Sequence, residues 1–128
     1  MCRRKGMAAR FIGAAGLLAG LVAMSAQAMP PGEEAKSQAL LLRVETSTDT
    51  VFIRNGSQYS AANAAEFLRR KCAKDWGRMA SAREFVGTCA SQSSTSGKPY
   101  LISIKGGTPR PSAEVLMEWL ETLERNAR

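Results

Sequence analysis

The sequence of 128 residues contains no histidine. Histidine is the usual base that activates a serine nucleophile and the commonest metal ligand in proteins. Its absence excludes a serine–histidine–aspartate triad, and a zinc site would have to be built from cysteines and carboxylates alone. Cysteine is also scarce, because there are only three and none forms a C-x-x-C pair. We therefore expect neither a metal site nor another cofactor.

Long apolar runs are few, and the clearest one is the uncharged stretch over residues 11–24. Basic residues precede it and the small-residue pattern Ser25-Ala26-Gln27-Ala28 follows it, which is the layout of a secretory signal peptide. A membrane-spanning helix needs about 20 apolar residues, so cleavage after Ala28 is favoured over an uncleaved anchor. The sequence predicts a signal peptide over residues 1–28 and a mature periplasmic domain over residues 29–128, with no stable membrane anchor.

The positive charge of this predicted domain is smaller than that of the whole chain. The formal net charge is +7, from 18 Lys and Arg against 11 Asp and Glu. Four of the basic residues lie in the predicted signal peptide, which leaves 14 against 11, or +3, for residues 29–128. An excess this modest does not favour nucleic acid as a partner.

Cys72 and Cys89 are the two cysteines that follow the predicted signal peptide. Outside the cytosol an even pair usually forms a disulfide. Closing so short a loop stabilises a small domain by roughly 3 kcal/mol in the chain-entropy model. Both cysteines fall on apolar stripes of consecutive predicted helices. A structural disulfide is therefore favoured over a redox or metal-binding pair.

Local patterns predict one small α+β domain. Asn55-Gly56 favours a type I′ turn, which pairs Phe52 with Tyr59 across a hairpin. Serines at the starts of three helices are good N-caps, namely Ser60, Ser81 and Ser112. The predicted elements are helices over residues 33–46, 61–74, 81–91 and 112–126, a hairpin over residues 50–60, and a strand over residues 100–105. The order is α-β-β-α-α-β-α, with a fourth short strand allowed near Thr108. A mostly antiparallel sheet with packed helices follows.

Residues 91–97, here called the serine loop, carry hydroxyl groups at five of their first six positions. The loop lacks the glycine spacing of a P-loop and precedes a strand, so a phosphate cradle of that kind is rejected. Ser94 or Ser96 could act as a nucleophile with Lys71 as its base, if burial lowers the pKa of the lysine. The simpler interpretation is a polar loop in which Gly97 makes a turn with positive φ.

Arg54 stands beside the tight turn of the predicted hairpin, on the same face as two aromatic residues. An arginine in this position could clamp a carboxylate with two hydrogen bonds. It could equally stack on Tyr59 in a cation–π contact. Basic residues at the end of the helix over residues 61–74 are placed favourably beside the negative end of its dipole. They could also contact acidic envelope polymers or lipid headgroups.

Four segments occur in one order with close spacing: "FIRNG" (52–56), "AAEFLRRK" (64–71), "SAREFV" (81–86) and "SSTSGKPYLI" (93–102). Together they resemble the YfeK-like family of small secreted bacterial proteins, a domain of unknown function. The family pattern maps onto Arg54, Asn55, Gly56, Leu68, Arg69, Lys71, Ser94, Ser96, Gly97, Pro99 and Tyr100. The position before Leu68, often histidine in that family, is Phe67 here. A mechanism that depends on that histidine is therefore not available to this chain.

We expect a non-enzymatic binding or interaction module of the cell envelope, with an envelope component or another protein as partner. The expected ligand-binding residues are Arg54, Asn55, Lys71, Ser94, Ser96, Gly97 and Tyr100. Two alternatives stay open at this point. One is a small serine/lysine hydrolase. The other is that these motifs serve the fold alone and that the function lies elsewhere.

Overall fold

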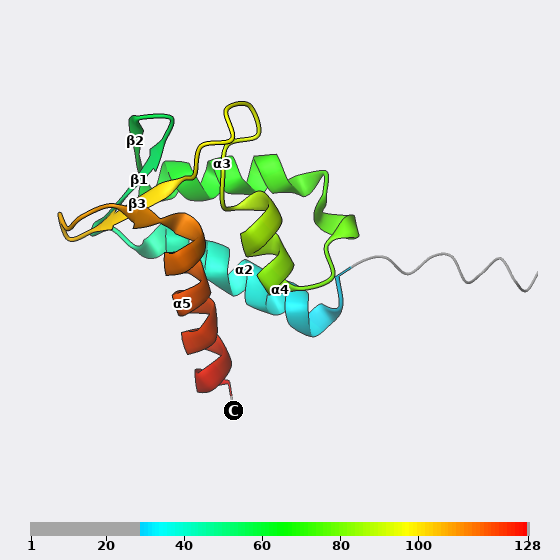
Figure 1. Cartoon of the computed structure of the whole chain (residues 1–128). Coiled ribbons are helices and arrows are strands. Elements are labelled where there is room, and N and C mark those ends of the chain that lie inside the picture. Colours follow the sequence, from blue (N-terminus) through cyan, green and yellow to red (C-terminus); the bar gives the residue numbers. More distant parts are fainter. Residues whose placement is uncertain (1–28, 128) are drawn as a thin grey trace, which may run out of the picture.

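The computed structural model describes residues 29–127 (Figure 1). The predicted signal peptide lies outside these described residues. Within them, the helices and strands follow the predicted order, and the fourth short strand is present. The main elements are α2 (Pro31–Thr46), β1 (Thr50–Arg54), β2 (Ser57–Ser60), α3 (Ala61–Ala73), α4 (Ala82–Glu84), β3 (Leu101–Ile104), β4 (Arg110–Pro111) and α5 (Ser112–Asn126). Two short segments, η2 (Trp76–Arg78) and η3 (Phe85–Cys89), flank α4. The α+β prediction is confirmed.

The strands form one antiparallel sheet in the order β2-β1-β3-β4. The β1–β2 hairpin has the predicted register, with Phe52 opposite Tyr59. Asn55 and Gly56 both have positive φ, at 50° and 82°, as a type I′ turn requires. β4 is short and lies at an edge, where its proline removes no ladder hydrogen bond from a central strand.

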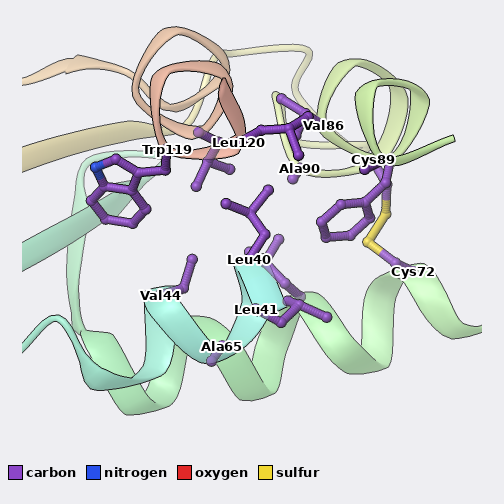
Figure 2. Packing of buried hydrophobic residues seen from close by; sticks show 14 of the residues in the cluster. Leu40, Leu41, Val44, Ala65, Cys72, Val86, Cys89, Ala90, Trp119 and Leu120 are labelled. Carbon is purple, nitrogen blue, oxygen red and sulfur yellow. A yellow bond between two sulfur atoms is a disulfide. The ribbon is translucent and has the colours of Figure 1, made fainter. Parts of the chain in front are cut away.

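The helices pack side by side around one hydrophobic core. In Figure 2 the side chains of Leu40, Leu41 and Val44 on α2 lie between α3, α5 and the segment that ends in Cys89. Leu40 and Leu120 are fully buried, and Trp119 is nearly so. Burial of apolar area at about 25 cal/mol per Å² makes these contacts the main source of stability. Within residues 29–127, no helix is long and apolar enough to cross a bilayer.

The predicted disulfide between Cys72 and Cys89 is present, with the two Cα atoms 5.9 Å apart. It joins the last turn of α3 to the end of η3, and both cysteines are buried (Figure 2). The crosslink fixes the C-terminal end of α3 against the start of the serine loop. This is the region in which the candidate site lies.

Two local predictions need correction. The helix predicted over residues 81–91 is regular only in α4, because η3 continues it with wider π-type turns that end in a bond from the Ala90 amide to the Phe85 carbonyl. Ser112 does not cap α5 through its side chain. Its hydroxyl instead donates to the Ala90 carbonyl at 2.7 Å, in a buried contact. A buried carbonyl needs a partner, and that demand takes the hydroxyl away from the helix end.

Candidate functional site

A groove of about 340 Å³ runs between α3, the β1–β2 hairpin and the serine loop. We call it the cationic groove. Three basic, three serine or threonine and two aromatic side chains line it: Arg54, Phe67, Arg70, Lys71, Ser93, Ser94, Thr95 and Tyr100. No carboxylate is among these lining residues. In Figure 1 the serine loop, in yellow, rises beside the hairpin, and side-chain hydrogen bonds described below connect the two.

Lys71 makes three hydrogen bonds at the cationic groove. Its Nζ atom donates to the Cys89 carbonyl at 2.9 Å, the Gln92 carbonyl at 2.7 Å and the Tyr100 hydroxyl at 2.9 Å. An ammonium group has three hydrogens, so each of them has an acceptor. Burial lowers the pKa of Lys71, and the nearby Arg54 charge lowers it further. The lysine therefore links α3 to the end of η3, to the serine loop and to Tyr100.

Arg54 stacks on aromatic rings at the opposite wall. Its guanidinium carbon lies 4.4 Å from the centre of the Phe67 ring and 5.7 Å from that of Tyr59. One of its N–H groups donates to the Tyr59 hydroxyl at 3.2 Å. A guanidinium has five N–H donors, and within residues 29–127 no carboxylate forms an ion pair with Arg54. The stacking interpretation thus describes its surroundings, and the carboxylate clamp stays a prediction.

Tyr100 is only 6% exposed, yet it lines the cationic groove. Its ring meets Phe67 edge to face, with centres 6.0 Å apart. Its hydroxyl oxygen accepts from Lys71, while its own hydrogen has no acceptor within the described part of the chain. Burial raises the pKa of this hydroxyl, against a smaller opposing effect of Arg54. The group therefore stays protonated at neutral pH and can donate to a ligand.

The serine loop is shaped by hydrogen bonds that start from the hairpin turn. Ser93 is buried, and its Oγ atom accepts from the Thr95 and Ser96 amides, each at 3.3 Å. Asn55 joins both serines: its Nδ2 atom donates to Ser93 at 3.4 Å, and its Oδ1 atom accepts from Ser96 at 2.6 Å. Gly97 has the predicted positive φ, at 75°. These contacts hold the serine loop against the hairpin turn, where the loop forms one wall of the cationic groove.

The predicted site residues divide into two groups. Arg54, Lys71, Ser94 and Tyr100 line the cationic groove, as a shared site requires. Asn55, Ser96 and Gly97 are not among its lining residues and instead build the wall behind it.

Four lining residues are not among the predicted site residues: Phe67, Arg70, Ser93 and Thr95. Arg70 belongs to a visible basic run, but nothing local distinguishes it from its neighbour Arg69, which pairs with Glu45 away from the groove. Phe67 stood out only as a departure from the family pattern. In the structure it lies between Arg54 and Tyr100.

The geometry offers little to a serine nucleophile. The Ser96 hydroxyl donates to Asn55, and neither Ser94 nor Ser96 is hydrogen-bonded to Lys71 within residues 29–127. A base needs a free lone pair directed at the nucleophile, whereas all three hydrogens of Lys71 are engaged. The same described residues contain no group of three or more Cys, Asp or Glu side chains arranged to hold a metal ion.

A model of a known protein family matches the part of the chain that forms the cationic groove. The model of a "Family of unknown function (DUF5329)" matches residues 31–124, which include every lining residue of the cationic groove. The uncharacterised protein YfeK of Salmonella typhimurium is 37% identical over 68 residues, which are 53% of this chain and 57% of that protein. The matched part thus spans little more than half the length of this relative. No solved structure is significantly similar to the chain.

Proposed function

Because the chain belongs to the DUF5329 family, whose function is unknown, we propose a function from the cationic groove itself. The protein binds an anionic group of another molecule there, as a non-enzymatic binding module of the cell envelope. The single observation that carries this proposal is the charge of the lining. Arg54, Arg70 and Lys71 face one hollow in which no carboxylate lines the surface.

The donors around the cationic groove suit an anion. Arg54 keeps N–H groups beyond the one given to Tyr59, and Tyr100 has a buried hydroxyl hydrogen without an acceptor in residues 29–127. Arg54 and Lys71 are partly buried and form no ion pair within residues 29–127, whereas the exposed Arg70 pairs with Glu66 at 3.2 Å. Positive groups without a counter-ion raise the local concentration of anions. Charge-assisted hydrogen bonds from such groups are about twice as strong as neutral ones. A carboxylate or a phosphate would satisfy both donors at once.

Two further observations support an envelope location. The leader pattern over residues 1–28 is that of an exported protein, and a buried disulfide is typical of an oxidising compartment. Envelope polymers, lipid headgroups and peptides there carry carboxylates and phosphates. A groove whose side chains are already held by hydrogen bonds suits recognition of one such group, because little ordering is needed on binding.

The test is a titration of the isotope-labelled, oxidised protein followed by amide chemical shifts. Acetate and inorganic phosphate are added separately at constant ionic strength, so that general screening does not change. We expect saturable shifts confined to the cationic groove. Arg54→Ala should weaken binding by about tenfold or more, the factor expected for one charge-assisted hydrogen bond.

Arg69→Ala is the matched control, because Arg69 lies on the same helix as Arg70 but pairs with Glu45 and does not line the groove. It removes the same charge, so it should leave affinity almost unchanged. Shifts that never saturate, or equal losses in both variants, would show that the anions respond to net charge only. The proposed function would then be wrong.

A further inference from the structure

A second hollow lies directly beside the cationic groove and differs from it in chemistry. It is a cavity of about 30 Å³. Its lining includes Tyr59 on the hairpin, Ala64 on α3, Ala90 and Tyr100 on either side of the serine loop, and Ser112 and Leu116 on α5. Arg54, Phe67 and Tyr100 line both hollows. A group held by Arg54 therefore lies next to the apolar cavity.

The cavity is suited to carbon and not to water. A buried water needs two to four polar partners, and the lining atoms are almost entirely apolar. The Ser112 hydroxyl is already used by the Ala90 carbonyl, and the Tyr59 hydroxyl accepts from Arg54. Entry of an alkyl group into such a cavity is favourable, because the apolar area of the group leaves water.

The size of the cavity limits that group. A cavity of about 150 Å³ holds benzene, and that is five times the volume found here. A volume of about 30 Å³ matches one methyl group or a methylene. A long acyl chain or an aromatic ring would require the wall to move, and that wall includes the fully buried Leu116.

We infer that the ligand of the cationic groove is a carboxylate that carries a small alkyl group beside the charge. The inference rests on the proposed function and narrows its ligand. A carboxylate has its carbon substituent directly on the charged group, whereas a phosphate ester places an oxygen between them. A carboxylate can therefore place its first carbon one bond closer to the charged group than a phosphate ester can, beside the wall that the two hollows share. The C-terminus of a peptide that ends in alanine and a short free acid such as propionate both have this chemistry.

The test compares N-acetylalanine with N-acetylglycine in the same chemical-shift titration of the unaltered protein. The two differ by one methyl group, so we expect N-acetylalanine to bind about fourfold more tightly, the factor for burial of one such group. Ala64→Val adds two methyl groups to the α3 side of the cavity and replaces no residue that lines the cationic groove. It should abolish this preference while leaving N-acetylglycine binding unchanged. The comparison in the unaltered protein stands even if this variant folds poorly.

The outcomes separate the inference from the proposed function. If both compounds bind equally, or if phosphate binds and no carboxylate does, the inference is wrong and anion binding stands. If nothing binds, both fail. If N-acetylalanine binds more tightly than N-acetylglycine, propionate and N-acetyl-alanyl-alanine identify the source of the carboxylate. Tighter binding of the dipeptide supports a peptide C-terminus, and equal or tighter binding of propionate supports a free short acid.

Discussion

The Ser112 and Ser103 hydroxyls each donate to a backbone carbonyl, at 2.7 Å and 2.6 Å, but only the first bond is buried. Without Ser112 the Ala90 carbonyl loses its partner in a place that water does not reach. We expect Ser112→Ala to cost about 1–3 kcal/mol of unfolding free energy. For a domain of this size, that lowers the melting temperature by roughly 4–8 °C per kcal/mol.

Ser103→Ala is the matched control for this prediction. It removes the same kind of hydrogen bond at an exposed site, where water replaces the hydroxyl, so its effect should stay within about 0.5 kcal/mol. Thermal unfolding of the oxidised protein measures both variants. Equal losses would mean that burial of the bond does not decide its contribution.

At the scale of elements, the serine loop and the hairpin turn form one unit through Asn55 and Ser96. The hydroxyl of Ser96 donates to Asn55 at 2.6 Å across 41 positions of sequence. We expect a coupling energy of about 1 kcal/mol between Asn55→Ala and Ser96→Ala in a double-mutant cycle of denaturant unfolding. Asn55 also holds a positive φ, but that cost is common to both arms of the cycle and cancels.

Ser94→Ala, combined with Asn55→Ala, is the control cycle. Ser94 is exposed and makes no hydrogen bond with Asn55, so its coupling should be near zero. A coupling as large as that of Ser96 would contradict the hydrogen-bonded wall. A coupling near zero for Ser96 itself would mean that the loop does not depend on the hairpin turn.

The elements that the sequence predicts correctly are those whose causes are local. The Asn55-Gly56 turn specifies both its own φ angles and the register of the hairpin. Ser60 caps α3 through the Asn63 amide at 3.2 Å, as its position implies. The π-type turns of η3 and the inward use of Ser112 have distant causes. The Ser112 hydroxyl bonds to the Ala90 carbonyl 22 positions away, and no local pattern carries this information.

At the scale of the whole molecule, the same distinction governs the candidate site. Arg54, Lys71 and Tyr100 stand out in the sequence because they lie at a turn, on the border of an apolar stripe and in a strand next to a polar loop. The structure shows that they line one hollow. That Phe67 lies under Arg54, and that Arg70 and not Arg69 lines the groove, depends on the rotation of α3 against the sheet. That rotation is set by packing on α2 and by the disulfide.

Acid stability is a property of the assembled helices because Glu33 connects three of them. Its carboxylate accepts from Lys36 on its own helix at 2.9 Å and from the Ala82 amide at the start of α4 at 3.0 Å. Lys36 in turn donates to Glu124 on α5 at 3.0 Å. The hydrogen bond from Lys36, followed by that from Ala82, lowers the pKa of Glu33 below its usual 4.5. The bond from Lys36 likewise lowers the pKa of Glu124.

A carboxyl whose pKa is lower in the folded protein than in the unfolded chain stabilises the fold above the unfolded pKa. That stability is lost as the pH falls through about 4.5 toward the lowered value, because the unfolded chain then binds more protons. We expect the urea midpoint to fall from about pH 5 to pH 3, and to fall less in Glu33→Gln, which cannot titrate. Glu121→Gln is the control, because Glu121 is exposed and forms no ion pair within residues 29–127. It should follow the unaltered protein. A Glu33→Gln curve that runs parallel to both would show that the acid response arises outside the contacts that join α2, α4 and α5.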